Sequence, residues 1–184
     1  MKTLILNGSP RLQGDTASLI VLLKRQLCGE TTLLSAYRDN ISPCVDCRCC
    51  RETGICAIRD DMDVVYADDF DTVVVASPVY FSAITPPMLA IVSRFQADFN
   101  GLRFRSETKT RRPKKGAVIL VGGASGGAES AGRHAYILMK ALNAHGSSEH
   151  TVTSMRTDFT PAAEDPKAIE GIREIAAFFN GPSL

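Results

Sequence analysis

The alternation of predicted strands and helices constrains the fold of this 184-residue chain more than any other feature. Short segments rich in Leu, Val, Ile and Thr recur along the chain, and turns separate them from segments with apolar residues at helical spacing. The predicted strands are Leu4–Leu6, Thr31–Leu34, Thr72–Ala76, Ala117–Val121 and Ser148–Met155. This order favours an α/β three-layer sandwich, with a five-stranded parallel sheet and helices on both faces.

The predicted helices follow from apolar spacing and from residues that favour helix starts. We expect Asp15 or Thr16 to cap the first helix and Cys28 to be a buried residue within it. Pro86 and Pro87 are expected to open a helix that carries Leu89, Val92 and Phe95. The other predicted helices are 62–67, 131–144 and a closing helix with Ile169, Ile172, Ala176 and Phe179 on one face.

Composition fits one compact domain over residues 1–184, because 45% of the chain is hydrophobic. The net charge of +1 gives no global attraction to nucleic acid or to a membrane surface. The opening segment is too short for a signal peptide, so we expect a cytoplasmic protein. We expect the acidic residues of segment 60–71 to lie at solvated helix ends and caps, with a metal-binding carboxylate site as the alternative. We expect segment 103–115 to be a solvated connecting loop, with phosphate binding as the alternative.

Three loops of unusual composition follow the first, third and fourth predicted strands, and such loops converge at the carboxyl edge of a parallel sheet. Residues 8–16 place glycines, hydroxyls and an arginine before a helix, which suits a phosphate. They match neither the Walker loop nor the dinucleotide fingerprint, and a plain turn with a helix cap is the alternative. Residues 77–82 are extended and aromatic, and 122–127 are glycine-rich. As alternatives to ligand binding, residues 77–82 could only cover the core and residues 122–127 could be a flexible turn.

The segments Asn7-Gly8-Ser9-Pro10-Arg11 and Ser77-Pro78-Val79-Tyr80-Phe81 resemble the NADPH-dependent FMN reductase family of the flavodoxin-like superfamily. The resemblance implies that Ser9, Arg11 and Thr16 bind the FMN phosphate. It also implies a binding contribution from Asp15, where relatives usually have Asn. Because a carboxylate repels a phosphate dianion, we expect the Asp15 side chain to cap its own helix, or only the Asp15 backbone N–H to contact the phosphate. The residues expected around the flavin ring are Pro78, Val79, Tyr80, Phe81, Ser82, Gly122 and Gly123.

Two further departures from the family lie on the helix after the second loop. Leu89 stands where relatives have Lys, and Ser93-Arg94 stands where they have Asp-Arg. We therefore expect any ion pair made by those family residues to be missing here.

Five of the six cysteines lie between Cys44 and Cys56, in a loop predicted over residues 41–59. Four soft donors this close can ligate an iron–sulfur cluster or zinc. The candidate ligands are Cys44, Cys47, Cys50 and Cys56, with Cys49 as a spare. This run resembles the iron-sulfur flavoproteins, which implies a 4Fe-4S cluster. Zinc and a metal-free thiol loop or disulfide remain as alternatives.

The resemblance implies a cytoplasmic FMN-dependent NAD(P)H oxidoreductase that passes electrons to a small molecule or to an electron-transfer protein. We expect no catalytic acid or base among the side chains, and a homodimer or homotetramer. The alternatives are an iron–sulfur electron carrier with little direct NAD(P)H activity, and a redox- or metal-sensing module that has lost flavin.

Overall fold

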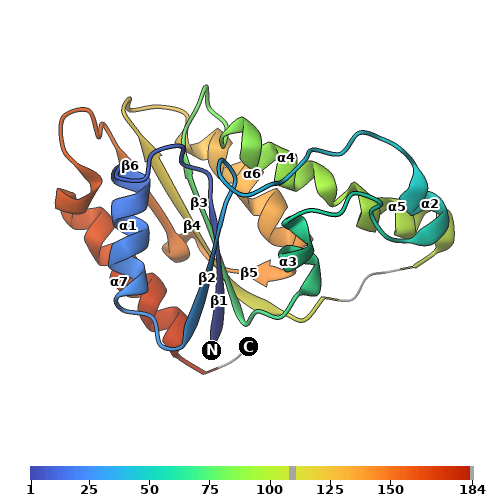
Figure 1. Cartoon of the computed structure of the whole chain (residues 1–184). Coiled ribbons are helices and arrows are strands. Elements are labelled where there is room, and N and C mark those ends of the chain that lie inside the picture. Colours follow the sequence, from blue (N-terminus) through green and yellow to red (C-terminus); the bar gives the residue numbers. More distant parts are fainter. Residues whose placement is uncertain (108–110, 183–184) are drawn as a thin grey trace.

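The computed structural model describes residues 1–107 and 111–182, which fold around one six-stranded sheet (Figure 1). The order is β2-β1-β3-β4, and β4 then pairs with the short β5 near its start and with β6 further along. All of these pairs are parallel, in the order typical of flavodoxin-like folds. The strands are β1 (Lys2–Asn7), β2 (Glu30–Ser35), β3 (Thr72–Pro78), β4 (Lys114–Gly122), β5 (Ala144–His145) and β6 (Thr151–Met155).

Helices cover both faces of the sheet, which confirms the predicted three-layer sandwich. Along β3, Val73 and Val75 face one layer, whereas Val74 and Ala76 face the other. The first layer contains α3 (Met62–Ala67), α4 (Pro86–Arg94) and α6 (Ala128–Ala141), and the second contains α1 (Asp15–Lys24) and α7 (Pro166–Asn180). Helices α2 (Cys49–Thr53) and α5 (Gln96–Arg105) lie side by side beyond the sandwich (Figure 1).

Several predicted boundaries are wrong. Helix α1 ends at Lys24, so Cys28 lies outside it and is exposed. The chain turns into β2 through Gly29, whose positive φ of 94° favours glycine. The helix predicted to open at Pro86 is present as α4, and its core positions are Met88 and Ile91, whereas Leu89 is 36% exposed. The predicted strand 148–155 begins with a 3-10 turn over Ser148–His150, and α5 was not predicted.

The basic segment 103–115 is not uniformly solvated, as the sequence suggested. Lys114 is buried and its Nζ lies 2.8 Å from Asp68 Oδ1. Buried Arg111 donates to Asp98 Oδ2 at 2.9 Å. These pairs tie the start of β4 to the elements that precede it, because a buried cation needs a fixed partner. Lys109 lies outside the described residues.

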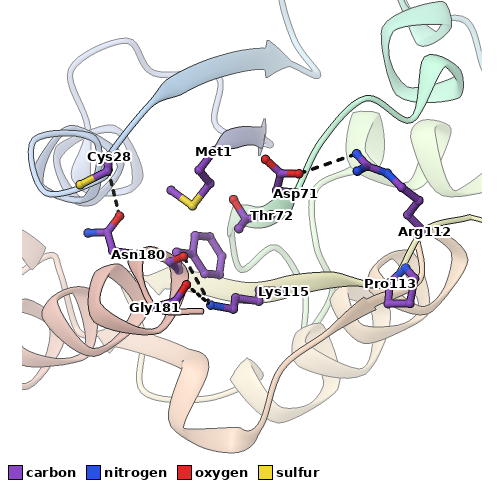
Figure 2. Close-up of a pocket in the computed structure, with 10 residues that line it drawn as sticks. Met1, Cys28, Asp71, Thr72, Arg112, Pro113, Lys115, Asn180 and Gly181 are labelled. Carbon is purple, nitrogen blue, oxygen red and sulfur yellow. Dashed lines mark hydrogen bonds and ion pairs between the residues drawn. The ribbon is translucent and has the colours of Figure 1, made fainter. Parts of the chain in front are cut away.

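A cavity of about 460 Å³ opens at the amino ends of the strands (Figure 2). Its buried cation, Lys115, donates to the carbonyl of Gly181 at 2.9 Å. The side-chain carbonyl of Asn180 accepts from the Cys28 amide at 2.9 Å, as Figure 2 shows. These polar groups close the end of α7 against the sheet. The polar groups of this cavity therefore hold the end of α7 in place, and the cavity lies at the edge of the sheet opposite to the three predicted loops.

The search for membrane-spanning helices, made over the residues that the structure describes, found none of sufficient length and apolarity.

The Asp165→Ala variant tests how α7 is held. Asp165 caps this helix by accepting from the Lys167 and Ala168 amides, and it also accepts from the Ser154 hydroxyl at 2.8 Å. We expect the variant to lower the free energy of unfolding by about 1–2 kcal/mol in urea titrations. Asp165→Asn is the matched control, since Asn also caps helices; an equal loss in both variants would contradict a capping role.

Candidate functional site

The carboxyl edge of the sheet carries a cavity of about 140 Å³ between loops that are far apart in sequence. The loops after β1, β3 and β4 meet there because these strands are neighbours and run in the same direction. The lining residues are Ser9, Pro10, Arg11, Gly14, Asp15, Thr16, Pro78, Val79, Tyr80, Val121, Gly122, Gly123, Thr157 and Asp158. Nine of the eleven predicted flavin-site residues are in this set.

The first loop places backbone donors at the start of α1. Its turn is held by Asn7, whose Oδ1 accepts from the Ser9 amide at 2.9 Å, and by the Ser9 hydroxyl, which accepts from the Arg11 amide at 3.2 Å. The helix cap is Gly14, which has no side chain to bond the first amides. These amides and the positive end of the helix dipole are the groups that bind phosphates at helix starts.

Neither Asp15 nor Thr16 caps α1, contrary to expectation. Asp15 Oδ1 instead accepts from the backbone amide of Ala162 at 2.8 Å. This bond fixes the segment after β6 against the first loop and engages one oxygen of the carboxylate. Asp15 still lines the cavity, and Thr16 is buried beside it.

The second loop makes a tight reversal that the sequence did not predict. Tyr80 and Ala83 exchange two backbone hydrogen bonds, each of 2.9 Å, around Phe81 and Ser82. Both tip residues have positive φ, 47° and 62°, which is uncommon for residues other than glycine. The reversal leaves Phe81 fully exposed. Phe81 and Ser82 are thus the two predicted residues outside the cavity lining.

Hydrogen bonds lock the second loop to its neighbours. The Val79 amide donates to Val121 O at 2.7 Å, and the buried Thr85 hydroxyl donates to Gly8 O at 2.8 Å. A Cβ on Gly127 would lie 2.9 Å from Ser82 Cα, so the second loop packs against the backbone of the third. The three loops therefore form one fixed unit.

A fourth wall, which the sequence analysis missed, comes from the loop after β6. The Thr157 amide donates to Gly122 O at 3.0 Å, and a Cβ on Gly123 would lie 2.5 Å from Asp158 Oδ2. This loop has no glycine-rich or aromatic pattern to mark it. The usable signal was its position, since β6 also ends at the carboxyl edge of the sheet.

The cysteine segment forms a second site. Four of its side chains, those predicted as ligands, line one small cavity: Cys44, Cys47, Cys50 and Cys56. Cys49 is outside this lining, and all six cysteines of the chain are free thiols. Within the described residues, no three His, Cys, Asp or Glu side chains converge closely enough for one metal ion. A zinc site needs that convergence, whereas the ligands of a four-iron cluster bind different iron atoms.

The donor set fits a cluster, although the cavity is small. Its volume of about 20 Å³ is enough for about one water molecule, so a cluster requires the surrounding loop to move outward. Apart from the short α2, the loop from residue 41 to 59 has no regular secondary structure. Asn100 of α5 already donates to Cys50 Sγ at 3.1 Å from a buried position.

Arg94 of α4 also lines the cysteine cavity, and it forms a buried ion pair with Asp60 that the sequence did not predict. Its Nη1 lies 2.6 Å from Asp60 Oδ2, and the two side chains are 0% and 2% exposed. Asp60 is therefore not solvated, contrary to expectation. Burial lowers the pKa of Arg94, but Asp60, Tyr66 and Cys56 raise it more, so the pKa lies above its usual value.

Comparison with known proteins bears on the family and the fold of the chain. Residues 1–155 match the family model for NADPH-dependent FMN reductase. The iron-sulfur flavoproteins of Methanocaldococcus jannaschii and Methanosarcina thermophila are each 28% identical to this chain over 134 residues, 70% of its length. The chain covers 66% and 67% of those proteins, about two thirds of each.

Among solved structures, RosB with a bound 8-demethyl-8-formylriboflavin-5'-phosphate is similar with a TM-score of 0.70 and 16% identity, over 96% of this chain and 76% of that one. The FMN-dependent NADH-azoreductase of Bacillus anthracis in complex with FMN has a TM-score of 0.59 and 15% identity, over 98% and 99% of the chains. At these identities the likeness shows the fold. Because the family model matches most of the sequence, the chain belongs to the NADPH-dependent FMN reductase family of flavin-dependent oxidoreductases.

Proposed function

We propose that this protein takes electrons from NAD(P)H onto FMN and passes them to a small-molecule or protein acceptor. The observation that carries the proposal is the cavity at the carboxyl edge, where the backbone amides of a helix start lie beside the second and third loops. FMN supplies the redox chemistry when bound, by accepting hydride and releasing electrons. The protein's part is to bind and orient it.

The first loop would hold the FMN phosphate through the Ser9 hydroxyl, the Arg11 guanidinium and the amides at the start of α1, including those of Asp15 and Thr16. The enclosed volume is smaller than that of a typical ligand pocket, so part of the cofactor would lie outside it.

The ring would lie against the second and third loops. Pro78, Val79 and Tyr80 supply apolar surface and backbone amides, and Gly122 and Gly123 let a flat ring approach the backbone. We place Phe81 and Ser82 at the rim, because the reversal turns them away from the cavity. No side-chain acid or base is assigned, since hydride transfer to flavin requires none.

The Arg11→Ala variant tests the phosphate site. Losing a charge-assisted hydrogen bond costs about 1.5–3 kcal/mol when the partner is fixed. Because Arg11 is exposed, we expect a loss of binding free energy at the lower end of this range. That corresponds to a Kd for FMN about tenfold higher, measured by fluorescence titration of the apoprotein. Lys24→Ala removes a positive charge from the last turn of the same helix and is the control. Equal weakening in both variants would rule out a specific contact.

NAD(P)H use is tested by mixing the oxidised holoprotein with NADH or NADPH in a stopped-flow instrument. Rapid bleaching of flavin absorbance by either nucleotide supports the oxidoreductase. Reduction by dithionite alone would favour the second candidate, an electron carrier.

That second candidate is favoured by the cysteine cavity. We propose that Cys44, Cys47, Cys50 and Cys56 hold a 4Fe-4S cluster, which would convert hydride input into single-electron output. Reduced thiols suit the cytoplasm, where we place the protein. We also propose a homodimer or homotetramer, supported by the exposed Phe99 and Leu102 of α5.

The cluster proposal predicts different results for two exposed cysteines that are two residues apart. Cys47→Ser removes a ligand, so anaerobically purified protein should lose most of its iron and its cluster absorbance. Cys49→Ser should keep both, since Cys49 lies outside the cavity lining. Iron analysis and absorbance spectra check this, and equal iron in the two variants would contradict the ligand assignment.

A further inference from the structure

Arg94 holds both ends of the cysteine loop from outside it. Its Nη1 donates to the carbonyl of Ser42, before the first cysteine of the loop, at 3.0 Å. Its Nη2 donates to the carbonyl of Ile58, after the last cysteine, at 3.0 Å. The preceding residue on α4 adds a third contact, because the Cys44 amide donates to Ser93 Oγ at 3.0 Å. A helix of the flavodoxin-like core thus fixes the base of a loop that has little secondary structure.

The same guanidinium brings a fully buried positive charge to the cysteine cavity. Asp60 balances it, and this carboxylate also accepts from the Ser42 amide at 2.9 Å and the Met62 amide at 3.1 Å. Arg94 lines the cavity, whereas Asp60 does not. The cation is therefore the member of the pair that faces the cysteines, and an arginine stays charged at all ordinary pH values.

One donor of Arg94 has no partner. Its Nε is buried and makes no hydrogen bond with the described part of the chain, although Nη1 and Nη2 are well bonded. Leaving a buried donor unpaired costs about 1–3 kcal/mol, so a partner is expected in the working protein. Sulfur atoms of a cluster held in this cavity are acceptors of the right charge. Asn100 supplies a second buried donor, to Cys50 Sγ.

We propose that Arg94 and Asn100 form a donor wall that positions the cysteine loop and raises the reduction potential of the iron–sulfur cluster it holds. The proposal rests on the proposed function, since it needs the cluster. Reduction adds a negative charge to the cluster, and a nearby cation and N–H groups bonded to its sulfurs stabilise the reduced state more than the oxidised one. Asn100 acts on the cluster through Cys50, and Arg94 acts through its charge and through the loop carbonyls that it holds.

The test is a redox titration of the cluster, followed by electron paramagnetic resonance in the full-length holoprotein. Arg94→Gln alone would leave Asp60 buried and unpaired, so the double variant R94Q/D60N removes both charges together. We expect it to make one-electron reduction of the cluster about tenfold less favourable, a shift of about 59 mV to lower potential. Asn100→Leu removes one donor and should shift the potential in the same direction, by less.

Asp60→Asn alone gives the opposite test, because it leaves the Arg94 charge without its balancing carboxylate. We expect this variant to raise the potential. Arg59→Gln is the matched control, since it removes a positive charge from the same segment at a side chain that is 62% exposed. Its potential should match that of the wild type, because solvent screens exposed charges.

The outcomes separate the two proposals. If the wild-type protein contains iron and a cluster, but R94Q/D60N, N100L and D60N all titrate like R59Q, the donor wall is wrong and the proposed function stands. If the wild-type protein binds no cluster after anaerobic reconstitution with iron and sulfide, both the cluster and the donor wall are wrong. Should the double variant fail to fold, the two single variants test the donor wall: N100L should lower the reduction potential of the cluster and D60N should raise it.

Discussion

Parallel pairing of β1, β3 and β4 is the constraint on which the rest of the structure depends. Side-by-side strands that run in one direction end at one edge, so the residues after each strand meet without any direct attraction between them. The crossover after β1 then places the start of α1 at this edge, and with it a set of backbone donors. The backbone donors and the cavity at this edge follow from this topology, before any particular side chain is chosen.

The predictable part of the site is the part that topology and backbone composition determine. β3 and β4 are buried on both faces, so they appear in the sequence as nearly continuous apolar runs, and their following loops could be located. The reversal at Phe81 and Ser82 could not, because neither residue is typical of positive φ. The loop after β6 has no distinctive residues, so only its position in the sheet marks it.

Long-range pairs account for the remaining errors. Arg94 and Asp60 are 34 residues apart, and Asp60 stands in an acidic run that resembles a solvated surface segment. Asp15 resembles a helix cap, yet it bonds an amide 147 residues away. Such choices depend on which group the tertiary fold brings within reach. Local sequence shows that a carboxylate is present but does not identify the donor it will accept from.

The two sites therefore depend on different properties of the chain. The edge cavity uses glycines, backbone amides and loop positions, which the sheet supplies, so the fold can persist at 14–17% identity to the similar solved structures. The cysteine cavity is lined by residues of α2, α4 and α5 and of the loop from residue 44 to 58, and it uses particular side chains: the thiols, Arg94 and Asn100. Its loop has little structure of its own, so its geometry depends on the buried contacts that α4 and α5 make with it.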